Sequence, residues 1–455
     1  MGTTADYELP ERLLCHDIKK VIFSALRSLV NRHPSLGIMS LGDNFPTARW
    51  CRLPYFDFKI IVRFVERSDQ VGVTSIIEDW HQHPIFGLQM APSVPLWRAI
   101  VIYSKSSTAE NPVTITFVSH PAIADGRSGV AFHMELLDIL DSLKIENEQP
   151  NSRVAMIRSV PMINSIAIVP TLQLLPPLED VHSFPVSPFF RANQFCKSIW
   201  PWRNKLCWTG PSIRAEPCAG RLRVLDVPSQ LTCKLLALCQ ENEVKLTALL
   251  SILIARVLAI NYPTYKRFKG SIRSFRRFTA TSGSAIVNYT TYFEQLYSTD
   301  LRTGYFLCGG EFSWDTVLAC NKEIEIATSN PKNQQVGLLR YIEDYGEWCQ
   351  NRIGREREYS FELSNVGCID GGNGECRIKK MMSSQSCNII GAPFVFSVAS
   401  VKGGPLTIAL SWQQDVIETE MAEKVRNDLC VEMKHVAERM EDDTNISGIK
   451  EKYLL

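Results

Sequence analysis

Residues 119–129 read Ser-His-Pro-Ala-Ile-Ala-Asp-Gly-Arg-Ser-Gly. The stretch before it, residues 113–118, is rich in β-branched side chains, which predicts a strand. After it, helical spacing predicts an amphipathic helix over about residues 128–143, with one apolar face made by Val130, Met134, Leu137 and Leu140. The quoted residues therefore join a strand to a helix.

Further outward, helical and strand patterns alternate. Apolar side chains at helical spacing predict a helix over residues 13–30, which proline stops at His33-Pro34. Ten of the 24 prolines fall in residues 150–217, a density that disfavours long helices and central strands. With 455 residues, the chain exceeds one ordinary core. We therefore predict an N-terminal lobe over 1–150, a proline-rich crossover over 151–220 and a C-terminal lobe over 221–455.

Composition excludes several classes of function. Apolar residues make up 45% of the chain, charged residues 21%, and the net charge is +1, so nothing favours nucleic acid or an anionic membrane as partner. The 14 cysteines form no CxxC pair, so no metal site is predicted and reduced thiols in the cytoplasm are expected. The longest apolar run, residues 246–260, is too short to span a bilayer.

The 119–129 segment resembles the His-His-x-x-x-Asp-Gly signature of the chloramphenicol acetyltransferase-like superfamily. That group includes condensation domains, plant BAHD acyltransferases and fungal alcohol acetyltransferases, and the last are the most similar. The resemblance extends, in family order, to three further segments, which are His33-Pro34-Ser35-Leu36, Pro95-Leu96-Trp97-Arg98 and Ser364-Asn365-Val366-Gly367. It implies an α/β fold (α+β mixed sheets) of two lobes around a central cleft or tunnel.

In the resembled family the second histidine is the general base, and this chain has Pro121 there. Proline has no ionisable group and cannot act as a base. His120 occupies the place of the first, non-catalytic histidine. Neighbours in an extended chain point to opposite sides, which favours a packed, hydrogen-bonded His120. Alternatively Pro121 redirects the loop and turns His120 inward, which makes His120 the candidate catalytic residue.

The same resemblance gives structural roles to the rest of the motif. It makes Asp125 a loop anchor paired with an arginine, next to Gly126 and Ser128. Arg273, Arg276 and Arg277 are candidates to pair with Asp125 or to hold a coenzyme A phosphate, with a solvated strand face as the alternative. The resemblance also implies a place near the tunnel for Asn288, Tyr289 and Thr290, although Val287 stands where the family tends to have glycine, and a place facing the active site for Ser364 and Asn365. His133 and Trp412 are further candidates, with a buried structural role as the favoured alternative.

Three functions are compatible with these residues. The first is acyl transfer from acyl-CoA, as a co-substrate and not a bound cofactor, to a small-molecule alcohol or amine of natural-product metabolism. The second is a repurposed scaffold that catalyses a cyclisation, such as a pericyclic ring closure of a terpenoid or polyketide, which needs no general base. The third is a non-catalytic binding protein. In each case we expect a monomer that binds a small molecule.

Overall fold

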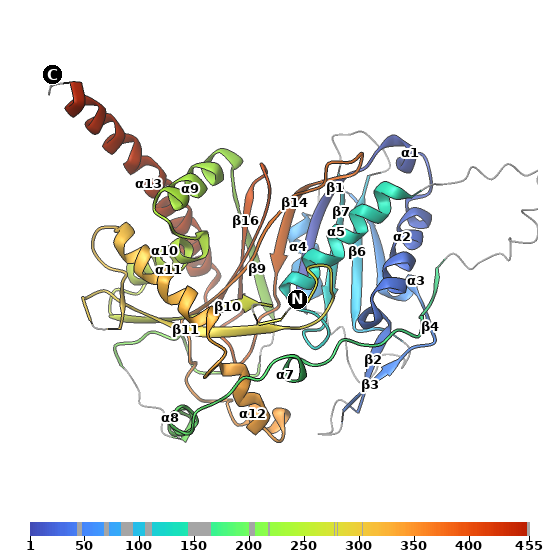
Figure 1. Cartoon of the computed structure of the whole chain (residues 1–455), viewed down its shortest axis with the longest axis horizontal. Helices are drawn as coiled ribbons and strands as arrows, with labels where there is room; N and C mark the ends of the chain where they lie inside the picture. Colours follow the sequence, from blue (N-terminus) through green and yellow to red (C-terminus); the bar gives the residue numbers. More distant parts are fainter. Residues whose placement is uncertain are drawn as a thin grey trace, which may run out of the picture.

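The computed structural model of the chain describes residues 1–42, 48–67, 72–82, 94–104, 112–143, 165–199, 205–216, 219–276, 278–279, 281–302 and 304–452. Two sheets with their helices form two halves that lie side by side (Figure 1). The predicted two-lobed α/β fold with mixed sheets is confirmed. The lobe boundaries stay a prediction, because residues 144–164 and 200–204 lie outside the described part.

The first sheet has five strands in the order β14-β1-β7-β6-β5. β5 runs parallel to β6, and the other neighbours are antiparallel. Its strands are β1 (Gly2–Glu8), β5 (Val62–Glu66), β6 (Trp97–Tyr103), β7 (Val113–Ser119) and β14 (Arg377–Ser384). The helices of this half are α1 (Glu11–Leu14), α2 (Ile18–Arg32), α3 (Phe58–Ile61) and α5 (Gly126–Ser142), with the 3-10 turn η1 (Pro34–Gly37). The helix α4 (Val73–Gln82) packs against residues 220–227 of the second sheet, where Glu78 pairs with Arg221 and Arg223.

The second sheet has seven strands in the order β12-β11-β10-β13-β15-β16-β9. These are β9 (Gly220–Val227), β10 (Arg267–Phe275), β11 (Thr290–Ser298), β12 (Phe306–Leu307), β13 (Phe361–Ile369), β15 (Phe394–Val401) and β16 (Leu406–Gln413). The helices of this half are α9 (Ser229–Glu241), α10 (Leu246–Asn261), α11 (Trp314–Ser329), α12 (Tyr345–Gln350) and α13 (Thr419–Lys452), with the 3-10 helix η2 (Gln335–Tyr341). β15 and β16 are buried on both faces, which explains their continuous apolar sequence.

The first half also carries two small ribbons at its edge (Figure 1). They are β2 (Ile38–Leu41) with β3 (Arg49–Arg52), and β4 (Tyr55–Asp57) with β8 (Ile166–Ile168).

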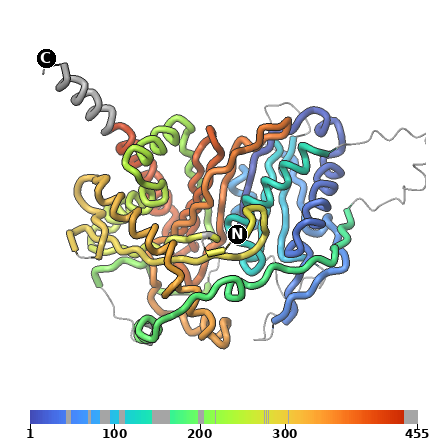
Figure 2. Tube along the Cα trace, viewed as in Figure 1, coloured from blue at the N-terminus to red at the C-terminus, as the bar shows by residue number. Residues whose placement is uncertain are grey.

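Two further features connect the halves. The segment 165–199, with α7 (Leu178–Val181) and α8 (Pro188–Ile199), crosses one face of the molecule toward the second half (green in Figure 2). β14 comes late in the chain, yet pairs with β1 in the first sheet. The two halves are thus joined by strand exchange as well as by the crossover.

Aromatic packing holds the 119–129 segment in place from both ends. Phe117 on β7 and Phe132 on α5 stack with ring centroids 4.1 Å apart, and Trp97 on β6 packs against both. All three side chains are fully buried. A strand and a helix fixed to each other in this way leave the loop between them little freedom.

Gly129 on α5 lies directly against the side chain of Thr3 on β1. A Cβ added at this position would lie 2.7 Å from the Cβ of Thr3 on β1. We expect Gly129→Ala to lower the free energy of unfolding by about 1–3 kcal/mol, because the extra methyl group overpacks this contact. Urea denaturation measures the loss. Gly283→Ala is the control, since open space surrounds that position, and equal losses in the two variants would contradict the assignment.

Candidate functional site

The loop after β7 is organised by hydrogen bonds of its own. Asp125 caps α5: its Oδ1 accepts from the Ser128 backbone N–H at 2.7 Å, and Ser128 Oγ accepts from the Asp125 N–H at 3.1 Å. The His120 N–H donates to the carbonyl of Leu96 at 2.9 Å. This reciprocal cap satisfies N–H groups that would otherwise lack partners where the helix begins.

Asp125 also pairs with an arginine from the second half. Arg276 donates from Nη2 to Oδ1 at 2.9 Å and from Nε to Oδ2 at 3.1 Å, and the Asp125 side chain is fully buried. Arg276 has a positive φ of 57°, an uncommon conformation for a residue other than glycine. The N–H of Tyr289 donates to Oδ2 at 3.2 Å. The ion pair therefore holds segment 276–289 against the motif loop.

The other two arginine candidates are not at this anchor. Arg273 forms a two-point pair with Glu362, at 2.9 and 2.8 Å, and its charge is therefore balanced within the second sheet. Arg277 lies outside the described residues. Both described arginines thus already have a carboxylate partner, and neither presents an unpaired charge to a phosphate.

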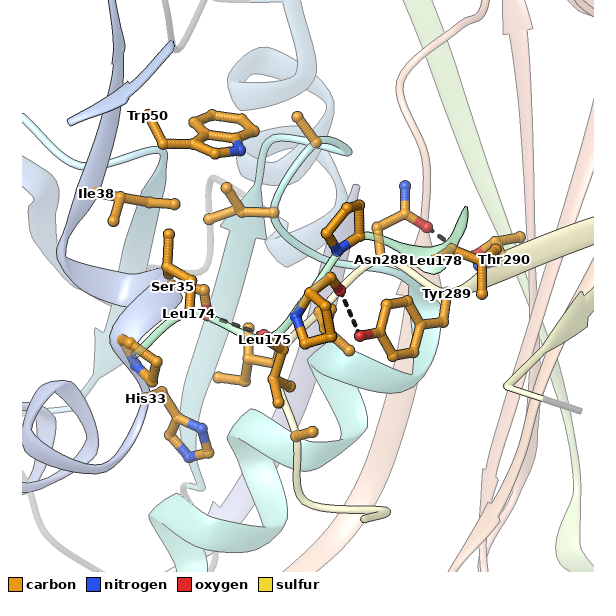
Figure 3. A pocket seen from close by; sticks show the side chains of 18 of the residues that line it. His33, Ser35, Ile38, Trp50, Leu174, Leu175, Leu178, Asn288, Tyr289 and Thr290 are labelled. Carbon is orange, nitrogen blue, oxygen red and sulfur yellow. Dashed lines mark hydrogen bonds between the residues drawn. The ribbon is translucent and has the colours of Figure 1, made fainter. Parts of the chain in front are cut away.

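A cavity of about 950 Å³ lies beside the motif loop. Ala122 and Ile123 of the loop form part of its wall, η1 and the crossover segment 173–179 form others, and residues 284–290 close the second-half side. Figure 3 shows its apolar side chains together with a few polar ones. The apolar ones include Ile38, Trp50, Leu174, Leu175 and Leu178. This composition suits a largely apolar ligand with a few hydrogen-bonding groups.

His120 and Pro121 do not line this cavity. Pro121 is exposed, and its carbonyl accepts from Nδ2 of Asn288 at 2.7 Å. Nδ1 of half-buried His120 accepts from the N–H of Ala122 at 3.1 Å. In a neutral imidazole only one ring nitrogen has a free lone pair, and here that nitrogen is occupied. The geometry disfavours His120 as a base, and a catalytic role for it stays a prediction.

The segment 288–290 reaches the cavity, and its role in a substrate site stays a prediction. Asn288, Tyr289 and Thr290 all line it. The hydroxyl of Tyr289 donates to the carbonyl of Pro176 at 2.6 Å, which fastens the crossover over this end of the cavity (Figure 3). Asn288 holds the motif loop through Pro121. These residues shape the wall, and none of them is an ionisable base at neutral pH.

The remaining candidates lie away from the cavity, in packed surroundings. His133 is fully buried in the first half: Nδ1 contacts the Tyr7 hydroxyl at 2.8 Å and Nε2 contacts the Thr3 carbonyl at 2.8 Å. Trp412 is buried in the core under the helices of the second half. Asn365 donates to Thr247 Oγ1 at 3.0 Å, and Ser364 is buried in β13. Other parts of the protein pack against these four side chains, so their contacts are structural.

Sequence reasoning missed the polar end of the cavity. His33 lines it from the end of α2, Ser35 from η1 and Glu135 from α5. Ser35 Oγ donates to the carbonyl of Ile286 at 2.9 Å. His33 Nε2 lies 3.0 Å from Glu135 Oε2. The sequence contains both partners, but nothing in it places residues 102 positions apart in contact.

Two further findings concern membrane-spanning helices and metal sites. Across the described ranges, no helix combines the length and apolar character needed to cross a membrane. Nor do three or more histidine, cysteine, aspartate or glutamate side chains gather into a possible metal site in those ranges.

Comparison with known proteins agrees with the motif and the fold. A family model described as alcohol acetyltransferase matches residues 81–196. "Probable alcohol acetyltransferase crmB" of Aspergillus fumigatus is 25% identical over 93% of this chain and 93% of its own length. "Probable alcohol acetyltransferase FCK4" of Fusarium pseudograminearum is 25% identical over 90% of this chain and 84% of its own.

Solved structures share the whole fold at low sequence identity. The trichothecene 15-O-acetyltransferase TRI3 of Fusarium sporotrichioides has a TM-score of 0.67 at 12% identity, covering 95% of this chain and 90% of its own. The first condensation domain of the calcium-dependent antibiotic synthetase has a TM-score of 0.61 at 12% identity, covering 96% and 90%. The chain thus shares the fold of these solved acyltransferase and condensation-domain structures. Over most of its length its sequence is similar to those of the fungal alcohol acetyltransferases.

The buried ion pair between Asp125 and Arg276 makes the stability of the protein sensitive to substitution of Asp125. Asp125→Asn leaves the guanidinium of Arg276 without its counter-charge, at a site where that side chain is only 8% exposed. We expect a loss of about 3–5 kcal/mol in the free energy of unfolding. Asp226→Asn, which removes the exposed 2.7 Å pair with Lys380, should cost less than about 1 kcal/mol. Chemical denaturation compares the two, and similar losses would count against the anchor role.

His133 predicts an acid-dependent loss of stability. Burial lowers the pKa of His133 from 6.5 to about 4, while its bond to the Thr3 carbonyl opposes this shift. The unfolded chain therefore binds the proton first, and the free energy of unfolding should fall as pH drops from about 6.5 to about 4. Chemical denaturation at a series of pH values gives the free energy of unfolding across this window. This free energy should change less with pH in His133→Gln than in the wild type. The same pH dependence in both proteins would show that His133 is not responsible.

Proposed function

We propose that this protein transfers an acyl group from an acyl thioester, acyl-CoA, to the hydroxyl of a small molecule of natural-product metabolism, within the cavity beside the motif loop. One observation supports this most directly: Ala122 and Ile123, inside the segment that resembles the family's catalytic signature, form part of the cavity wall. The similarity to fungal alcohol acetyltransferases supports the same reaction class. We expect the protein to act as a cytoplasmic monomer.

The reaction requires that the acceptor hydroxyl and the acyl thioester are held next to each other. It requires no covalent bond to the protein. The hydroxyl oxygen attacks the thioester carbonyl carbon, a C–O bond forms, the C–S bond breaks, and the hydroxyl proton ends on the thiol. Holding both reactants in one cavity replaces a bimolecular encounter, which can contribute several orders of magnitude in rate. Pro121 contributes no proton transfer, so the acceptor's proton must go to another group.

The cavity indicates the kind of acceptor. Its volume of about 950 Å³ is at the upper end of ordinary small-molecule sites, and its wall is mainly aliphatic and aromatic. A small, polar alcohol would leave most of this surface uncovered. We therefore expect a lipophilic acceptor of terpenoid or polyketide size with few hydroxyl groups.

Base-free cyclisation of such a molecule is the second candidate. Two observations favour it, the replacement of the family base by Pro121 and the mainly apolar wall. A concerted ring closure requires enclosure and shape and no proton acceptor. It differs from acyl transfer in needing no thioester.

Filling the cavity tests the assignment of the site. Leu175 is 45% exposed and lines the cavity, so Leu175→Trp should narrow it and lower kcat/KM for acyl transfer by about 10-fold or more through misplacement of the acceptor. Leu236→Trp is the matched control, because that leucine is 43% exposed on α9 and does not line the cavity. The assay follows free thiol release from acetyl-CoA, and ester formation by mass spectrometry, with a panel of lipophilic alcohols.

The assay separates the alternatives. Acyl transfer that is insensitive to Leu175→Trp would place the reaction elsewhere. Absence of thiol release with every acceptor, combined with conversion of a polyene to a ring product, would replace acyl transfer by cyclisation. Tight binding without any conversion would indicate a binding protein.

A further inference from the structure

One wall of the cavity carries a histidine paired with a carboxylate. His33 follows the last residue of α2, and its Nε2 lies 3.0 Å from Oε2 of Glu135 on α5. The two side chains are 8% and 16% exposed, so water screens the pair little. Arg32 Nη1 lies 3.6 Å from the same oxygen and adds a second positive neighbour to Glu135. In Figure 3 the His33 ring lies at the end of the cavity opposite Trp50.

This pairing selects the tautomer of the imidazole. An ionised carboxylate only accepts hydrogen bonds, so Nε2 of neutral His33 carries the proton and Nδ1 keeps its lone pair. Within the described part of the chain, Nδ1 of His33 makes no hydrogen bond. His33 lines the cavity, its Nε2 is held by a carboxylate, and its Nδ1 has no hydrogen-bond partner among the described residues. General-base catalysis requires an oriented ring with one such nitrogen left for the substrate hydroxyl.

His33 also lies at the C-terminal end of a helix. His33 is the residue that caps α2 at its C-terminus, and its N–H donates to the Leu29 carbonyl. Carbonyl groups at this end of a helix give it a partial negative charge, which stabilises a nearby cation. Glu135 adds a full negative charge. The His33 ring therefore lies beside one full and one partial negative charge.

No other described histidine combines these features. His120 has its Nδ1 lone pair occupied by Ala122, and both nitrogens of His133 are bonded in the core. His81 is bonded to Ser384, and His182 is bonded to the Ser183 carbonyl. Among the described residues that line the cavity, His33 is the only histidine.

We propose that His33 is the general base of this protein and that Glu135 is its positioning residue; this inference rests on the acyl transfer proposed above. His33 Nδ1 takes the proton as the acceptor hydroxyl oxygen bonds to the carbonyl carbon of the acyl thioester. The C–S bond then breaks, and the imidazolium returns the proton to the departing thiolate, giving ester and free thiol. The base thus comes from the end of α2, while the motif loop forms only part of the wall.

The central variant is His33→Gln. The glutamine amide can stand in for the ring N–H toward Glu135, but it has no basic nitrogen. We expect kcat for ester formation to fall by about 10²- to 10⁴-fold, with the melting temperature and the acceptor's Kd unchanged. His435→Gln is the matched control, because that histidine lies on the exposed face of α13, and it should leave kcat unchanged.

Chemical rescue distinguishes a base from a packing role. His33→Ala should regain activity with added imidazoles, and the regained rate should rise with the basicity of the imidazole used. A ring that only filled space would restore activity irrespective of its basicity. Glu135→Gln should lower kcat less than His33→Gln, since it weakens the tautomer preference and leaves the ring in place.

A measurement on the wild type covers the case in which these variants do not fold. Diethyl pyrocarbonate should inactivate the enzyme in step with modification of His33, located by peptide mass spectrometry, and the acceptor alcohol should slow both. Inactivation that does not follow His33, or a folded His33→Gln variant with wild-type kcat, would overturn the inference while acyl transfer stood. Failure of the wild type to form any ester from acetyl-CoA would instead overturn the proposed function itself.

Discussion

A buried ion pair between Asp125 and Arg276 is the constraint on which the site depends. Moving two charges out of water costs several kcal/mol for each ion, and such a pair is tolerable only when hydrogen bonds satisfy both partners. Here the carboxylate also accepts from the N–H groups of Ser128 and Tyr289, and Arg276 also donates to the Ala285 carbonyl at 2.8 Å. The pair thus connects the beginning of α5 in the first half to the loop before β11 in the second.

The cavity exists because three distant segments meet at this connection. The motif loop and η1 come from the first half, residues 284–290 from the second, and residues 173–179 from the crossover between them. Each segment is fastened by a hydrogen bond to another: Tyr289 to Pro176, Ser35 to Ile286, and Asn288 to Pro121.

The motif residues that organise the loop are different from the ionisable residues that line the cavity. In this chain the motif residues Asp125, Gly126 and Ser128 are buried and organise the loop, whereas Pro121 is exposed and lies off the cavity. The ionisable groups that line the cavity instead include His33, Glu135 and Arg32, which meet where α2 ends against α5. The loop is anchored by the side chain of Asp125, whereas Pro121 contributes only its backbone carbonyl to the bond with Asn288. Loop geometry therefore does not depend on a histidine side chain at position 121.

Some features of this protein followed from local sequence. The strand before residue 119 and the helix after residue 128 were predictable from side-chain periodicity, and the spacing of Asp125 and Gly126 in that connection indicated the superfamily. The sequence also showed that Pro121 cannot act as a base, since this depends on its chemistry alone. Local pattern failed at β1, which was not predicted.

Tertiary structure alone decided which distant residues meet. The sequence offered three arginines for Asp125, and only packing of β10 and its following loop selected Arg276. It offered His120 as the candidate base and gave no reason to connect His33 with Glu135, because side chains on two separate helices come into contact only when those helices pack. Periodicity and motif spacing report on neighbours along the chain, whereas a site built from α2, α5, the crossover and residues 284–290 is defined by contacts between segments that only the folded chain brings together.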